Sequence, residues 1–152
     1  MRITDPRKMY WNIGTENTKL PEDREEMVRQ WQDLAQRAAD KIAESGIPVR
    51  ISDRRNPLEH GPGAIVNVHP THPFGVTLDW ELQNEFEEAI SNEEISPEAR
   101  TARYRRRIIV REIMLDATLR LLHTAGFITM KDHEEGDYYH YRVIAAPGDY
   151  PC

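Results

Sequence analysis

The chain has 152 residues, of which 39% are hydrophobic and 30% are charged, as expected for one ordinary globular domain. Its formal net charge of −6 argues against a general surface for nucleic acid or anionic membranes, because both attract basic proteins. The one cysteine, Cys152, excludes an internal disulfide framework and a cysteine-rich zinc site. No apolar run approaches the roughly 20 residues of a membrane span, and the polar start lacks an export signal, so we expect a cytoplasmic protein.

Residues 1–20 follow neither a helical nor a strand period, and we expect them to form an irregular arm. The arm carries Tyr10 and Trp11, whose rings need a surface to lie on. That surface is either the core of the same chain or a neighbouring subunit, as is common for terminal segments. Tyr10 and Trp11 are therefore candidate interface residues.

The residues from Pro21 to Gly46 predict a helix that begins with a proline and carboxylates and ends at a glycine. Its apolar residues recur three or four positions apart and predict one buried stripe. Alternating patterns then predict three short strands, at 47–51, 64–68 and 74–80, and Pro48 suits a sheet edge or a first strand position.

Leu78, Leu82, Phe86 and Ile90 also fit a four-residue spacing, so we expect the chain to switch to helix within a few residues of Asp79, which is a competent cap. This segment is strongly acidic and includes Glu85 and Glu88. Its carboxylates nearly match, in number, a set of arginines that follows.

A long helix is predicted from Ser96 to Thr124, with Ser96 as N-cap, Pro97 at the first helical position and Gly126 beyond its end. Its second half carries apolar residues on more than one stripe, which predicts burial on several sides. The residues in question are Ile108, Ile109, Ile113, Leu115, Leu119 and Leu122.

The first half of this helix carries a basic row, Arg103, Arg107 and Arg111, at four-residue spacing. Three interpretations stay open: pairing with Glu85, Glu88 and their neighbours within the chain, the same pairing between subunits, or a nucleic-acid contact. A winged-helix DNA-binding regulator is the specific form of the last. Carboxylates in the loop that would form its wing repel phosphate, so sequence-specific nucleic acid is not the expected partner.

The stretch from Leu58 to Pro73 contains His69 and His72, and a small metal-dependent enzyme that uses these histidines is a further alternative. A zinc site needs three or four converging ligands, and neither a nearby cysteine nor a His-Glu-x-x-His helix is present. Phosphate-binding glycine loops and the G-x-S-x-G nucleophile motif are also missing from the sequence. We therefore expect no enzyme, no catalytic residue, no metal and no cofactor.

A β-hairpin is predicted at the end of the domain, with strands at 127–131 and 138–145. Tyr139, Tyr141 and Val143 share one face. The other face, with Tyr138, His140 and Arg142, is expected to be exposed, and Tyr138 and His140 suit a subunit interface because amphipathic rings are favoured there. Residues 147–152 are expected to be irregular.

These elements predict an α+β fold, with helices packed on a small mixed or antiparallel sheet. Its parts are an arm (1–20), one domain (21–146) and a tail (147–152). The order of arm, helix, strands, helices and hairpin resembles that of the tail-terminator and neck proteins of tailed bacteriophages. The closest local likeness is a helix that ends at Ala125, Gly126 and Phe127, followed by an acidic loop and the returning strand YYHYRVIAA.

The resemblance implies a non-enzymatic structural subunit of the virion, assembled in the host cytoplasm. It would form a ring at the head–tail junction with copies of itself and contact other neck and tail proteins, without a membrane. Charged residues and the arm would make the subunit contacts. Of the residues named above, those expected at subunit contacts are Tyr10, Trp11, Glu85, Glu88, Arg103, Arg107, Arg111, Tyr138 and His140.

Overall fold

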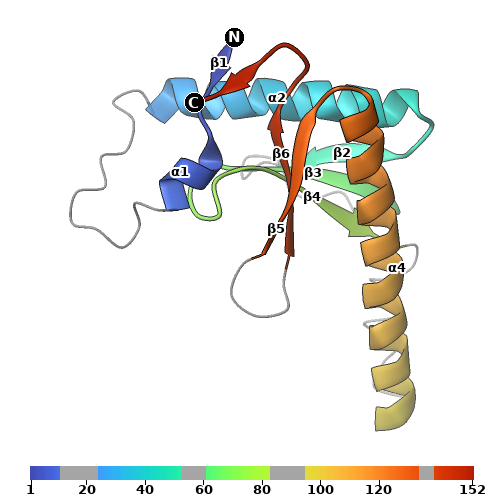
Figure 1. Ribbon diagram of the computed structural model, residues 1–152. Helices are drawn as coiled ribbons and strands as arrows, with labels where there is room; N and C mark the ends of the chain where they lie inside the picture. The colour runs from blue at the N-terminus through green and yellow to red at the C-terminus, as the bar shows by residue number, and fades with distance from the viewer. Residues whose placement is uncertain (11–23, 53–60, 83–94, 134–138) are drawn as a thin grey trace.

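The computed structural model describes residues 1–10, 24–52, 61–82, 95–133 and 139–152, and it confirms the α+β class (Figure 1). No helix within these ranges is long and apolar enough to cross a membrane. The elements, in chain order, are β1 (Arg2–Ile3), α1 (Pro6–Tyr10), α2 (Arg24–Glu44), β2 (Val49–Ser52), β3 (Gly63–His69), β4 (Gly75–Glu81), α4 (Pro97–Thr124), β5 (Ile128–His133), β6 (Tyr139–Ala145) and β7 (Tyr150–Pro151).

The main sheet is mixed and has the strand order β2-β3-β4-β6-β5. β2 runs parallel to β3, and the remaining neighbours are antiparallel. β2 lies at an edge, as the proline before it predicts. The chain passes close to itself here, since a Cβ on Gly63 would lie 2.3 Å from the carbonyl oxygen of Pro48.

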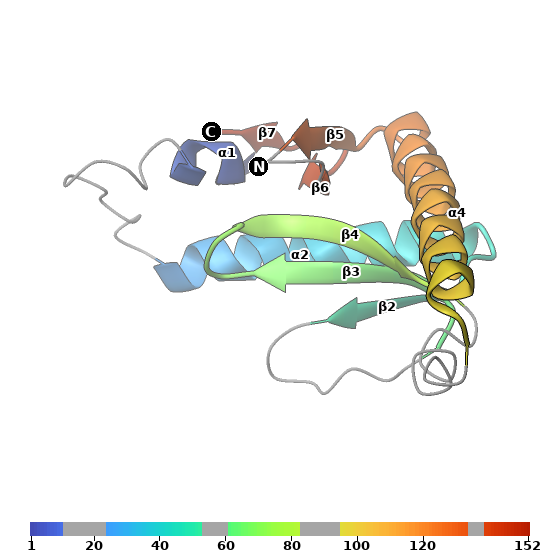
Figure 2. The same ribbon diagram turned by 90° about the horizontal axis from the view of Figure 1, so that it is seen from below.

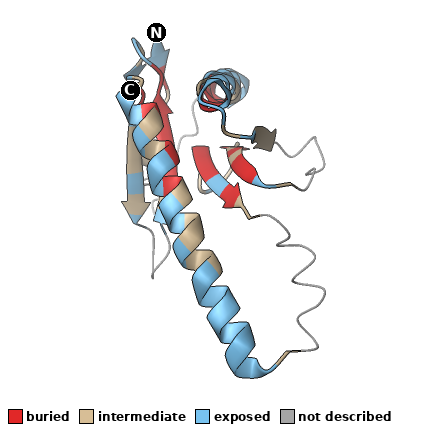
Figure 3. Ribbon diagram, turned by 90° about the vertical axis from the view of Figure 1, so that its right-hand side faces the viewer, coloured by how far each residue is buried: buried red, intermediate tan, exposed pale blue. Residues whose placement is uncertain are grey.

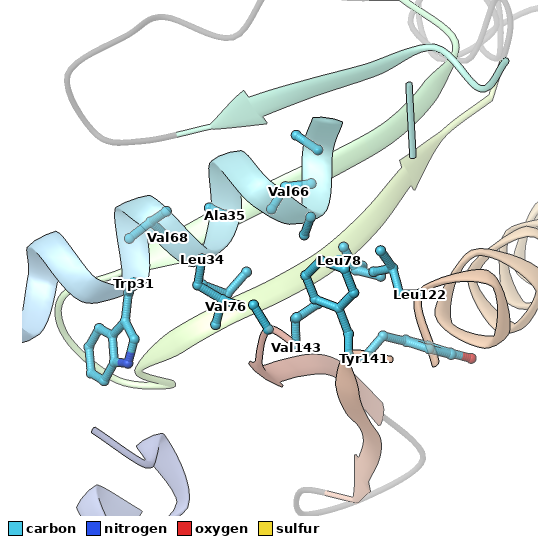
Figure 4. Close-up of a cluster of buried hydrophobic side chains, with 14 of the residues drawn as sticks. Trp31, Leu34, Ala35, Val66, Val68, Val76, Leu78, Leu122, Tyr141 and Val143 are labelled. Carbon is cyan, nitrogen blue, oxygen red and sulfur yellow. The ribbon is translucent and has the colours of Figure 1, made fainter. Parts of the chain in front are cut away.

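One face of the sheet is apolar, and α2 covers it (Figure 2). The helix presents a single stripe of buried residues, as its period predicts: Met27, Trp31, Leu34, Ala35, Ala38, Ala39 and Ile42. Val66, Leu78 and Tyr141 lie side by side on β3, β4 and β6 and pack into the same core (Figure 4). Alternation along each strand therefore places the core on this face.

β4 continues to Glu81, so Asp79 is part of a strand and does not cap a helix. Asp79 keeps its strand register opposite Ile65. Its carboxylate accepts a hydrogen bond from the backbone N–H of Trp80 instead of capping a helix. Residues 83–94, which include Glu85 and Glu88, lie outside the described part of the chain.

Both chain ends contain strand, which corrects the expectation of an irregular arm and tail. β1 pairs in parallel with β7, so that Arg2 lies opposite Tyr150 and Ile3 opposite Pro151. The proline is accommodated because its neighbours donate instead: Tyr150 donates to the Met1 carbonyl and Cys152 to that of Ile3. Strands of two residues are too short to show a period, so the sequence pattern missed them.

The N-terminal segment is tied to α2 by Thr4, whose backbone N–H donates to Gln30 Oε1 and whose carbonyl accepts from Trp31 Nε1, both at 3.0 Å. Within the segment, Asp5 is 5% exposed. Its carboxylate accepts hydrogen bonds from the backbone N–H of Arg7 at 3.0 Å and from the guanidinium at 2.6 to 3.1 Å. Burial alone would raise the pKa of Asp5, but the bonds and charge of Arg7 outweigh it and hold that pKa below its ordinary value.

Arg142 was expected on an exposed face, and it is instead fully buried. Nε donates to Asp132 at 2.9 Å, and the two terminal nitrogens donate to the carbonyls of Phe74 and Pro73 at 2.6 and 2.9 Å. The N-terminal segment lies over this region, because a Cβ on Gly75 would lie 2.7 Å from the Pro6 ring and 3.8 Å from Arg142. Arg142 does lie on the face of β6 opposite Tyr141, as the alternation predicts. That face is buried here because the N-terminal segment covers it.

We predict that Asp5→Asn lowers the free energy of unfolding at neutral pH by about 1 to 2 kcal/mol, because it removes the charge that Arg7 binds. Since the pKa of Asp5 in the folded state lies below its ordinary 3.8, this stabilisation is present above that pH and disappears as the pH falls through the folded-state pKa. Urea unfolding at neutral and strongly acidic pH measures the difference. Asp33→Asn, on the exposed side of α2, is the control and should change the free energy of unfolding at neither pH.

Arg142→Lys should lower the free energy of unfolding by about 2 to 3 kcal/mol, since one ammonium group cannot serve three acceptors arranged around a planar guanidinium. Arg103→Lys makes the same chemical change at an exposed position of α4 and should cost almost nothing. Chemical denaturation of both variants provides the measurement. Equal stability of the two would contradict a structural role for the buried guanidinium.

Candidate functional site: the exposed helix and the cavity beside it

α4 extends beyond the rest of the domain (Figures 1 and 3). Ser96 accepts a hydrogen bond from the backbone N–H of Ala99, Pro97 follows at the start, and the 28 residues span about 42 Å at 1.5 Å per residue. The end of the helix packs on the sheet through Leu115, Thr118 and Leu122. Every residue from 97 to 106 is exposed, so the first turns form a surface open on all sides.

The second half of α4 is buried on one side only, and the expected burial on several sides is wrong. Ile109 is 57% exposed and Ile113 is 59% exposed. Nine residues make about two and a half turns, so the buried Thr118 and Leu122 lie directly across the helix from these isoleucines. The apolar residues therefore form two opposite faces, and of these the described part of the chain buries only the inner one.

The predicted arginine row follows the side of α4 that turns toward the sheet. Arg103 is exposed and Arg107 is partly buried. Arg111 binds within its own chain: Nε donates to the Trp80 carbonyl at 3.1 Å and lies 3.8 Å from Asp79 Oδ1. Among the residues of α4 that face away from the sheet, the arginines are Arg105, Arg106 and Arg120.

Most of the other expected contact residues fall outside what the structure describes. Trp11, Glu85, Glu88 and Tyr138 lie in undescribed ranges, and Tyr10 is the last residue of α1 without a described side chain. Of the aromatic and acidic candidates, His140 alone is placed, on β6 and partly buried.

A cavity of about 780 Å³ lies between α4, β4 and β6. Pairing of β4 with β6 extends only from Val76 to Leu78, and beyond that point the two strands diverge (Figure 1). Leu78, Ile108 and Leu115 form an aliphatic part of the cavity wall. The rest of the wall is polar and aromatic, with both charges present, and includes His69, Thr77, Asp79, Tyr104, Arg111, Glu112, Tyr139, His140 and Tyr141. Tyr104 and Tyr141 were not predicted for a common site, because their proximity depends on how α4 crosses the sheet.

Tyr141 lines this cavity and is 4% exposed, and its hydroxyl has no partner in good hydrogen-bond geometry in the described structure. Burial raises the pKa of Tyr141, and the nearby carboxylates of Asp116 and Glu112 add to this, while the Lys131 ammonium partly offsets it. Lys131 Nζ lies 3.4 Å from Asp116 Oδ1, and 4.6 and 5.2 Å from the ring centres of Tyr139 and Tyr141. The ion pair joins the hairpin to α4, and the two cation–π contacts join β5 to β6 within the hairpin.

The histidine loop is placed on the turn between β3 and β4. His69 lies 2.8 Å from the Thr77 hydroxyl, and the exposed His72 packs edge-on against Phe74, with ring centres 6.4 Å apart. No group of three or more potential metal ligands gathers among the residues that the structure describes. The contacts seen here are hydrogen bonding and ring packing.

Tyr141→Phe should change the free energy of unfolding by less than about 1 kcal/mol, because the buried hydroxyl has no partner in good hydrogen-bond geometry, although the Lys131 ammonium lies near it. The raised pKa of Tyr141 adds a pH dependence. Above pH 10 the phenol of Tyr141 ionises in the unfolded state at a lower pH than in the folded state. The wild type therefore loses stability there, and the variant, which has no phenol at this position, keeps it. Denaturant unfolding measures both effects. Tyr104→Phe is the exposed control, and a clear loss for Tyr141→Phe alone would show that the hydroxyl makes a stabilising bond.

The most prominent features of the described surface are therefore a helix with an uncovered apolar face and a polar, aromatic cavity beneath it. Both are suited to binding, and the first is suited to another protein. Comparison of the chain with models of protein families, with curated proteins and with solved structures found no match.

Proposed function

We propose that this chain is a structural subunit that assembles with copies of itself, and more specifically a tail-terminator or neck subunit of a tailed bacteriophage. It would form a ring at the head–tail junction of the virion and contact other neck and tail proteins. The observation that carries the proposal is the uncovered face of α4, where Ile109 and Ile113 are more than half exposed.

Single exposed apolar residues are common on protein surfaces and need no partner. Here, however, two isoleucines lie one turn apart on a helix that already has a buried face on its other side. Covering an isoleucine side chain is worth about 1.5 to 3 kcal/mol. Burial of both isoleucines against a protein partner would therefore contribute substantially to the free energy of binding, which supports assembly over an isolated monomer.

The phage role is supported by the order of the elements. A helix, the β2-β3-β4 part of the sheet, the long α4 and the closing β5-β6 hairpin follow one another in the order on which the resemblance was based. Edge strands add contact area, since β5 is at an edge and its Ile128 is 42% exposed. Subunits in rings use such surfaces for head-to-tail contacts.

The exposed arginines of α4 favour one alternative, a DNA-binding regulator. Arg103, Arg105 and Arg106 are all exposed within a short stretch of helix. Glu98, Glu112 and Asp116 are exposed on the same helix, and their charges oppose a phosphate backbone. Assembly is therefore the better-supported function.

We predict that the purified protein forms a ring-sized species, or associates as its concentration rises. Sedimentation velocity across a wide range of concentration measures this, and negative-stain electron microscopy shows whether the large species is a ring. A strict monomer throughout would contradict the proposal. An electrophoretic shift with duplex DNA that disappears as salt is added would favour the regulator instead.

A further inference from the structure

We infer that the outer face of α4 pairs with the same face of a second copy, with the two helices antiparallel. The inference specifies one self-contact of a protein already proposed to assemble. The outer face repeats with alternating spacings of four and three residues, which is the period of two helices that pack along their length. Its members are all exposed: Ala102, Arg106, Ile109, Ile113, Asp116 and Arg120.

The face is open to another molecule along its length. In Figure 3 α4 lies in front of the sheet, and no described element crosses over it. The buried residues Leu115, Thr118 and Leu122 are on the opposite side and hold the helix to the domain. A second copy can therefore approach the outer face without displacing any described contact of the core.

The order of residues on this face is self-complementary. Consider a two-fold axis that passes beside residue 111 of both copies. A residue that precedes 111 by some number of positions in one copy then lies opposite the residue that follows 111 by the same number in the other copy. Ile109 of one copy then lies opposite Ile113 of the other, two positions to each side, and Arg106 lies opposite Asp116, five positions to each side. The arrangement gives an apolar centre of four isoleucines flanked by two ion pairs.

Charge selects the antiparallel direction. In a parallel pair at the same register, Arg106 would face Arg106 and Asp116 would face Asp116, which is unfavourable. Asp116 is available for the contact, since its side chain is 55% exposed and Lys131 Nζ approaches only Oδ1. The second oxygen can accept from a guanidinium of the other copy.

A contact of this kind uses the same surface on both partners and closes at two copies. A ring needs a different, head-to-tail contact between unlike surfaces. The helix pair and the proposed ring can therefore fail independently. A dimer without rings would overturn the proposed ring at the head–tail junction and leave the helix pair standing, and rings that do not depend on this face would overturn the helix pair alone.

The first test replaces the apolar centre. Ile109→Asp combined with Ile113→Asp should weaken self-association by at least about 30-fold, because buried central contacts carry most of an interface's binding energy. Tyr104→Asp is the matched control: Tyr104 is 57% exposed on the same helix but lines the cavity side, so its replacement should leave the dimer intact. Circular dichroism confirms folding of each variant. Unchanged association in the isoleucine variant would overturn the inference.

The second test reads the direction of the pair by disulfide trapping. With Cys152→Ser as background, one protein carries Arg106→Cys and a second carries Asp116→Cys. Antiparallel helices predict a mixed disulfide between the two proteins and little of either homodimer, because like positions then lie about 15 Å apart along the axis, beyond disulfide reach. Predominant homodimers would show a parallel pair, and no cross-link at all would show that the faces do not meet; either result overturns the inference.

Discussion

The architecture depends on the single apolar face of the sheet and on what is available to cover it. α2 presents one stripe, from Met27 to Ile42, and lies wholly on that face. α4 is longer than the remaining area requires, so only its last turns, from Leu115 to Leu122, are buried there. The surplus length and the outer isoleucines are left in solvent. A long helix on a short sheet thus provides both the core and the surface that we propose for assembly.

The opposite face of the sheet is held together by polar contacts. Arg142 crosses from β6 to the carbonyls before β4 and to Asp132 on β5, so one guanidinium connects three parts of the chain. It is buried because the N-terminal segment, fixed by the bonds of Thr4 to α2 and by the pairing of β1 with β7, lies against the same region. Burial of a charge is tolerated where every donor finds an acceptor, and here the backbone supplies two of them.

The cavity and the outer face of α4 are linked through one group of residues. Lys131 approaches Asp116 from the hairpin while its ammonium lies over Tyr139 and near Tyr141. Asp116 belongs at the same time to the face proposed for the second copy. Occupation of that face would therefore act on the carboxylate that binds Lys131, whose ammonium lies near two tyrosines of the cavity wall. The proposed assembly would be coupled to the cavity through this shared side chain.

Local signals were sufficient for much of the fold. The serine cap and proline of α4, the stripe of α2, the alternation in β3 and β4 and the edge position of β2 all depend on neighbours in the chain, so the sequence predicts them directly. The sequence also showed that α4 is apolar on more than one side.

Contacts between distant residues were decided only by the tertiary structure. The burial of Arg142 requires the N-terminal segment, the strands at both ends require each other, and the cavity requires the divergence of β4 from β6. Whether Ile109 is core or surface depends on which side of α4 meets the sheet, and no local pattern decides between two apolar sides.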